Sequence, residues 1–129
     1  MFDFEKLKCY KKALAFSNWV YEITKEFPKD EQFGVISQFR RAALSIPLNI
    51  AEGVGRYNKK DRQHFYRMAR SSSFECIPLI EISLQQQYID NSIYVEARSK
   101  CEELSKIIMG LIKALHTNTV IQEKEKYIS

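Results

Sequence analysis

The chain has 129 residues, of which 45% are hydrophobic and 28% are charged. This length suits one domain, and such a domain buries about two-thirds of the surface that its unfolded chain exposes, so its core needs neither disulfides nor metal. Only four glycines and three prolines are present, which leaves room for few turns and argues against an all-β fold. The net charge of +4 is too small to establish a nucleic-acid partner by itself.

The cysteines indicate free thiols rather than a disulfide framework. Cys9, Cys76 and Cys101 are odd in number, far apart and outside any Cys-x-x-Cys spacing, which is typical of reduced thiols in the cytoplasm. The first residues carry acids and alternate polar with apolar side chains, unlike a signal peptide. No run of about 18 apolar residues could span a membrane. We therefore expect a cytoplasmic protein without membrane contact.

Apolar spacing predicts a first helix over about residues 5–27, and the residue before Pro28 ends it because proline disfavours helical geometry there. This helix carries two adjacent apolar stripes, more than one bundle core needs. The excess predicts either a subunit interface or a helix wedged between two neighbours. The stripes are Leu7, Tyr10, Leu14, Ser17, Tyr21 and Thr24, and Ala13, Phe16, Val20, Ile23 and Phe27.

A second helix is expected from about residue 30, with Asp30 as its N-cap, to about residue 53 or 56. Its apolar face would contain Phe33, Ile36, Phe39, Ala43, Ile46 and Ile50.

A Gly-rich turn at residues 53–58 separates the second helix from a third, which Asn58 or Asp61 opens and which runs to about Gln86. Ser92 is the candidate cap of a fourth helix. The apolar period of that helix is the cleanest in the chain: Ile93, Ala97, Cys101, Leu104, Ile108, Leu111 and Leu115.

Four helices of similar length joined by short turns predict an all-α fold, an antiparallel up-down-up-down four-helix bundle. We expect the bundle over residues 1–116 and a polar tail over residues 117–129 that frays.

No motif of enzyme chemistry is apparent. A di-iron bundle needs Glu-x-x-His pairs, and neither His64 nor His116 has a glutamate three residues before it. No base stands at a diagnostic spacing from the serines at 71–73. The glycines at 53 and 55 lack the third glycine and the lysine of a phosphate loop. We therefore expect a non-catalytic protein without cofactor or metal.

Basic residues are concentrated between positions 56 and 70, where Asp61 is the only acid. Four positions of the third helix follow a 3-4-4 spacing, at residues 59, 62, 66 and 70, and would form one ridge able to meet phosphates. Aromatic side chains lie among the charges, and aromatic rings can stack on unpaired bases. The sequence therefore predicts a nucleic-acid interface at the corner between the second and third helices; an ordinary solvated face is the alternative. The candidate residues are Arg56, Lys59, Lys60, Arg62, Tyr66, Arg67 and Arg70.

Polar residues also follow the second helix at helical spacing, beside its apolar stripe. If that stripe is partly buried, the charged members need partners, because an unpaired buried charge costs several kcal/mol. We interpret these residues as a structural network that fixes the register of the second and third helices. The candidates are Arg41, Ser45, Asn49, Glu52, Ser72 and Glu75.

Residues 38–56 read Gln-Phe-Arg-Arg-Ala-Ala-Leu-Ser-Ile-Pro-Leu-Asn-Ile-Ala-Glu-Gly-Val-Gly-Arg. This stretch resembles the signature of the four helix bundle proteins encoded by intervening sequences in bacterial 23S ribosomal RNA genes. Residues 4–13, 27–31 and 65–75 are also similar to that family. The chain departs from the family at residues 71–75, where Gly-Ser-Leu-x-Glu is usual, and at residues 86–89, where Leu-Gly-Tyr-Ile is usual.

The resemblance implies a ring of five identical bundles. A related protein, the accessory variability determinant of diversity-generating retroelements, has this fold and binds a reverse transcriptase and nucleic acid. We therefore expect a homo-oligomer, with a pentamer favoured, that binds nucleic acid, with RNA favoured, and that could also bind a protein such as a reverse transcriptase. The alternative is a protein-interaction scaffold without nucleic-acid contact.

Overall fold

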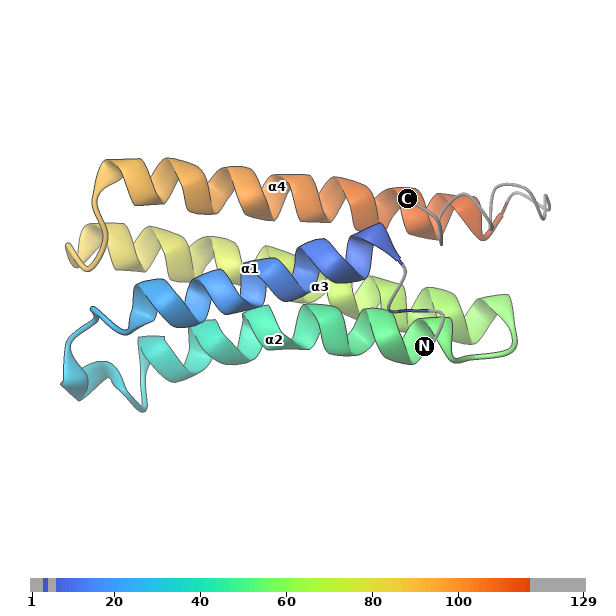
Figure 1. Ribbon diagram of the computed structural model, residues 1–129, viewed down its shortest axis with the longest axis horizontal. Coiled ribbons are helices and arrows are strands. Elements are labelled where there is room, and N and C mark those ends of the chain that lie inside the picture. The colour runs from blue at the N-terminus through green and yellow to red at the C-terminus, as the bar shows by residue number, and fades with distance from the viewer. Residues whose placement is uncertain (1–3, 5–6, 117–129) are drawn as a thin grey trace.

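The computed structural model describes Phe4 and residues 7–116. It contains α1 (Lys8–Thr24), a short 3₁₀ turn η2 (Lys29–Glu31), α2 (Val35–Val54), α3 (Lys59–Gln85) and α4 (Asn91–Ala114). Successive helices run in opposite directions, and short turns join them (Figure 1). The predicted four-helix bundle is therefore confirmed. The predicted tail at 117–129 lies outside the described residues.

The apolar period of α4 is buried as predicted. Six of its seven positions lie in the core and Ile93 is half-buried. These side chains of α4 pack against α3, whose buried positions are mostly occupied by small side chains, so α3 and α4 can approach closely. The buried positions of α3 are Tyr66, Ala69, Ser73, Cys76, Ile80 and Ser83.

Helix α1 lies between α2 and α4, which explains most of its double stripe. On the α2 side, the Thr24 hydroxyl accepts a hydrogen bond from Arg40 Nε (2.8 Å). On the α4 side, Lys12 forms an ion pair with Glu103. The wedged helix is thus observed, although Leu14 remains 39% exposed.

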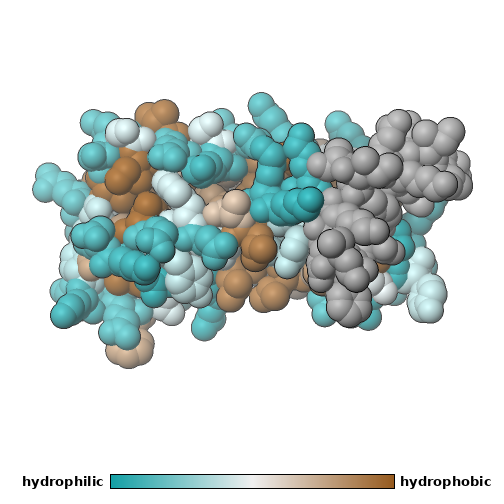
Figure 2. Space-filling model, viewed as in Figure 1, coloured by the Kyte–Doolittle hydropathy of each residue, from teal (hydrophilic) through white to brown (hydrophobic). Residues whose placement is uncertain are grey.

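Part of the first stripe of α1 still faces solvent beside α2. Leu14 and Tyr21 are more than one-third exposed, as are Leu44 and Leu48 on α2. Figure 2 shows hydrophobic atoms at the surface over α1 and α2, near the middle of the molecule. We call these four residues the α1–α2 apolar surface.

Two predicted helix starts are wrong. Asp30 does not cap the second helix, because residues 29–31 form the 3₁₀ turn and α2 begins at Val35. Phe33 therefore lies in the connection, where it is 91% exposed, instead of on the apolar face of a helix. Helix α4 is capped by Asp90, whose Oδ1 accepts from the Ile93 amide (2.8 Å), and not by Ser92.

Within the described part of the chain, none of the helices combines the length and the apolar character that crossing a membrane requires.

Candidate nucleic-acid interface

The packing of α2 against α3 beside their connecting turn depends on Gly53, the last residue but one of α2. A Cβ atom at this position would lie 2.6 Å from Tyr66 Cε1 and 2.8 Å from its Cδ1, closer than packed carbon atoms approach. The missing side chain therefore lets the Tyr66 ring pack against the end of α2, where it is 2% exposed. This contact joins α3 to α2 directly beneath the turn.

Hydrogen bonds fix the start of α3. The Asn58 side chain accepts from the Asp61 amide (2.8 Å), as an N-cap residue does. Arg62 Nε donates to the Arg56 carbonyl (2.7 Å), so one guanidinium is used to close the turn. Of the two predicted caps, Asn58 and Asp61, the structure shows Asn58. Arg62 is half-buried rather than a free phosphate ligand.

Arg56 follows the end of α2, and its guanidinium group is held by two contacts. Its Nη2 is 3.0 Å from Glu52 Oε2, and its guanidinium carbon is 4.6 Å from the centre of the Phe65 ring. Next to it, Tyr57 is fully exposed in the turn. The corner therefore presents one positioned guanidinium and one free aromatic ring, together with the exposed Lys59 and Lys60.

The predicted basic ridge of residues 59, 62, 66 and 70 does not exist as one surface. Tyr66 points into the core, since it belongs to the buried row of α3, and cannot stack on a base. Arg70 is half-buried and lines a pocket between α3 and α4. The 3-4-4 spacing was compatible with either face of the helix, and the Tyr66–Gly53 contact turns it inward.

A different line of side chains faces solvent on α3. Lys60, His64, Arg67 and Ser71 are all exposed, and their 4-3-4 spacing places them on one helix face. His64 was noted in the sequence as an aromatic ring among the basic residues, but neither His64 nor Ser71 was among the candidate interface residues, because a histidine among charges is usually an ordinary solvated side chain. The signal was available in the sequence, since His64 lies four residues after Lys60 and three before Arg67.

This line borders a groove between α2 and α3 with a volume of about 520 Å³. The α3 side of the groove carries His64 and Arg67, whereas the α2 side carries polar groups of Ser45 and Asn49. When the Gln63 amide is oriented to satisfy its neighbours, its oxygen accepts from Arg67 Nη2 (2.7 Å) and its nitrogen donates to His116 Nε2 (2.9 Å). Arg67 is therefore held at the edge of the groove.

Of the six residues in the predicted polar network, only Ser45, Asn49 and Ser72 use their side chains in hydrogen bonds to other members. Ser72 donates to the Ser45 hydroxyl across the two helices (3.2 Å), and Asn49 Nδ2 donates to the Ser45 carbonyl (2.8 Å). The other three candidates, Arg41, Glu52 and Glu75, are exposed. The condition of the prediction, that the stripe is partly buried, therefore holds for Ser45 and Asn49, whereas Arg41, Glu52 and Glu75 face solvent and pay no cost of buried charge.

The thiols lie away from this face. Cys9, Cys76 and Cys101 are free and buried in the core, and burial raises the pKa of the Cys9 thiol to about 12. A thiol in this environment is a poor nucleophile. No group of three or more metal-binding side chains occurs among Phe4 and residues 7–116.

These features define an all-α four-helix bundle with a basic corner and a polar groove between α2 and α3. Residues 5–110 match the family model described as 23S rRNA-intervening sequence protein. The chain therefore belongs to this family, and the resemblance seen in residues 38–56 is confirmed. No curated protein matches the chain.

A solved structure supports the fold. The crystal structure of a protein with unknown function from the S23 ribosomal protein family of Bacteroides thetaiotaomicron is similar to this chain, with a TM-score of 0.76. The two sequences are 22% identical, and the alignment covers 81% of this chain and 98% of the other. At this identity the likeness establishes the bundle and leaves the function open.

Proposed function

We propose that the protein is a non-catalytic oligomer that binds nucleic acid through the α2–α3 corner. The observation that carries this proposal is the exposed line Lys60–His64–Arg67 beside the polar groove. Together with Arg56 and Lys59, the side chains of Lys60 and Arg67 place positive charge along one edge of the bundle. Phosphate contacts of this kind supply the affinity and orientation of a nucleic-acid complex without reading its sequence.

The local charge balance supports this reading. Asp61 is the only acid between residues 56 and 70, and its carboxylate accepts a hydrogen bond from Asn58 (3.1 Å) at the start of α3. Glu52 offsets Arg56 in part, but the pair is solvent-exposed on both sides. Such exposed pairs are worth only about 0–1 kcal/mol, so Arg56 can exchange Glu52 for a phosphate at little cost.

RNA suits the corner better than duplex DNA. Tyr57 presents a fully exposed ring, and His64 adds a second exposed ring. Unpaired bases in loops and bulges of structured RNA can stack on such rings. Of the three rings that the sequence places among the basic residues, Tyr57 and His64 are exposed for stacking and Tyr66 is buried.

Self-association would strengthen this binding. The α1–α2 apolar surface leaves Leu14, Tyr21, Leu44 and Leu48 partly exposed, as expected of a helix face that meets another copy. In the five-membered ring implied by the family resemblance, each copy would add a net charge of +4 to one field. The same surface also supports the second candidate function, a protein-interaction scaffold whose partner is a protein such as a reverse transcriptase.

The test is the salt dependence of binding to a structured RNA hairpin, measured by fluorescence anisotropy. Each neutralised phosphate should contribute about −0.7 to −0.9 to the slope of log K against log salt. The variant Lys60→Gln with Arg67→Gln should flatten this slope by about two such contacts per engaged subunit and weaken binding to all sequences alike.

The matched control is Lys25→Gln with Lys29→Gln, which removes the same charge near the α1–α2 connection, at the opposite end of the bundle (Figure 1). Equal loss in both double variants would mean diffuse attraction and refute a site at the corner. No RNA or DNA binding at low salt would leave the scaffold function. Sedimentation equilibrium tests the oligomer: a monomer of 15.2 kDa at micromolar concentration would contradict it.

A further inference from the structure

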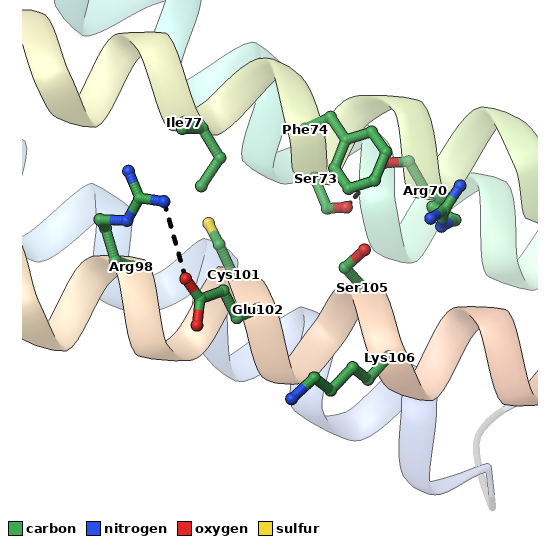
Figure 3. A pocket seen from close by; sticks show the side chains of 9 residues that line it. All are labelled: Arg70, Ser73, Phe74, Ile77, Arg98, Cys101, Glu102, Ser105 and Lys106. Atoms are coloured by element: carbon green, nitrogen blue, oxygen red, sulfur yellow. Dashed lines mark hydrogen bonds and ion pairs between the residues drawn. The ribbon is translucent and has the colours of Figure 1, made fainter.

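A second cavity, lined by both polar and apolar side chains, lies on the other side of α3, between α3 and α4. Its volume is about 320 Å³, at the lower end of the range of about 300–1,000 Å³ for ligand pockets. Arg98 and Arg70 lie at its two ends, and the hydroxyls of Ser73 and Ser105 point toward each other between them (Figure 3). Polar groups from both helices thus converge on one space.

The pocket also has an apolar side. Phe74 and Ile77 of α3 line it, and the Cys101 side chain points toward Ile77 from α4 (Figure 3). Phe74 is 49% exposed, a large exposure for a phenylalanine in the middle of a long helix. A ring held in this way offers a stacking surface to a planar group.

Its positive charge is only partly offset. Arg98 lies between two carboxylates, with Glu81 Oε1 at 2.7 Å and Glu102 Oε1 at 3.6 Å, so these three groups together carry one negative charge. In contrast, neither Arg70 nor Lys106 makes an ion pair with another described residue. Two cations therefore remain available to a ligand.

Arg70 is the most informative of these side chains. Its guanidinium carbon lies 4.5 Å from the centre of the Phe74 ring, which orients the planar group against an aromatic face. Its Nε is buried without a hydrogen-bond partner, and no other buried side-chain nitrogen or oxygen of the described residues is in that state. Leaving such a donor unsatisfied is unfavourable, so an acceptor that reached Nε after a small shift of the Arg70 side chain would be stabilising.

We propose that this pocket binds the terminal phosphate monoester of a nucleotide, with Arg70 and Lys106 on the phosphate and Phe74 against the base. A phosphate monoester carries a charge of about −1.5 to −2 at neutral pH, which matches the two unpaired cations. The planar guanidinium of Arg70 can donate two parallel hydrogen bonds to phosphate oxygens, and the Ser105 hydroxyl lies between the helices to add a further donor. The Ser73 hydroxyl already donates to the Arg70 carbonyl (2.6 Å). The apolar wall favours a ligand with a planar ring over inorganic phosphate.

This site is separate from the α2–α3 corner, because Lys60 and Arg67 do not line it. The proposal therefore does not depend on nucleic-acid binding at the corner. A free mononucleotide and the phosphorylated end of a strand present the same chemistry. Competition by a 5′-phosphorylated oligonucleotide, but not by its 5′-hydroxyl form, would assign the pocket to strand ends, whereas failure of both to compete with a mononucleotide would assign it to free nucleotides.

The experiment is isothermal titration calorimetry of the full chain with AMP, adenosine, ribose 5-phosphate and inorganic phosphate. AMP should bind at least about tenfold more tightly than each of the other three, because only AMP engages both the cations and Phe74. The other nucleoside monophosphates should bind within a few-fold of AMP, because stacking on an aromatic ring tolerates every base. No heat from AMP at millimolar concentration, or equal affinity for adenosine, would overturn the proposal.

Variants locate the site. Arg70→Gln should weaken AMP binding at least about tenfold, and Lys106→Gln, an exposed change that keeps the fold, should weaken it several-fold. Phe74→Leu should weaken AMP but leave ribose 5-phosphate unchanged. Lys113→Gln, an exposed cation of the same helix outside the pocket, is the control and should have no effect. Loss of AMP binding in the corner variant Lys60→Gln with Arg67→Gln, but not in the pocket variants, would refute the site.

Discussion

Replacement of Gly53 by alanine tests the packing that sets the α2–α3 corner. In an ordinary helix this change stabilises by about 1 kcal/mol, because glycine loses more backbone entropy on folding. Here the new Cβ would lie 2.6 Å from Tyr66 Cε1 and 3.2 Å from Phe65 Cβ. Tyr66 is 2% exposed and has little room to move.

The clash should outweigh the gain in helix propensity. Overpacking a well-packed core costs about 1–3 kcal/mol, so we expect Gly53→Ala to lower the free energy of unfolding by about 1–2 kcal/mol after the gain in propensity is included. Gly110 is the matched control, since it lies inside α4 and a Cβ there would meet nothing within 4 Å. Gly110→Ala should therefore raise the free energy of unfolding by about 1 kcal/mol.

Urea unfolding followed by far-UV circular dichroism measures both variants. The sign of the change is the decisive result: opposite signs support the packing argument, and stabilisation by both changes refutes it. A second step isolates the contact. In a Tyr66→Leu background the cost of Gly53→Ala should largely vanish, because the ring atoms that the new Cβ meets are gone, and a double-mutant cycle would report that coupling.

Two further predictions concern the first turns of α4 and their contact with α3. Asp90→Ala should destabilise the protein by about 0.5–2 kcal/mol, because Asp90 caps α4, whereas Ser92→Ala should change little; denaturation midpoints compare the two. The Tyr94 hydroxyl donates a hydrogen bond to Glu81 (2.6 Å), and this bond is the main reason that the pKa of Glu81 is lowered. The ionised carboxylate therefore stabilises the fold above the ordinary carboxyl pKa, and this stabilisation is lost as the pH falls through the pKa of Glu81 in the folded state. Tyr94→Phe should raise the pKa of Glu81 in a carboxyl NMR titration and weaken the acid dependence of stability; an unchanged titration would contradict this assignment.

The start of α4 shows why some local features were predicted and others were not. Asp90 and Ser92 both have side chains suited to an N-cap, and they stand two residues apart. Whether Asp90 or Ser92 caps α4 depends on which of them the preceding turn places next to a free backbone amide of the helix. That turn includes Gln87, whose φ is 63°. A non-glycine residue in this region is uncommon, so the path of the turn into α4, and with it the choice of cap, could not be derived from residue preferences. The predicted end of the third helix at about Gln86 nevertheless agrees with the observed end of α3 at Gln85.

Sequence by itself determined the number of helices and the buried face of α4, and it limited the cap of α3 to Asn58 or Asp61. Each of these follows from interactions within one helix or one turn, where the spacing of 3.6 residues and the preference of asparagine for the N-cap act without reference to the rest of the chain. The buried stripe of α4 was clear because one contiguous face carries its large apolar side chains.

Only the tertiary structure decided the direction of Tyr66, and with it the nature of the candidate site. On α3, polar and apolar residues alternate without a single dominant stripe, so the spacing of residues 59, 62, 66 and 70 fitted a surface ridge. The space above Gly53 is complementary to an aromatic ring, and this fit between two helices turns Tyr66 inward. Because the positions of side chains around one helix are fixed relative to each other, the orientation of α3 that buries Tyr66 also exposes His64 and Arg67 along the groove and places Arg70 beside α4.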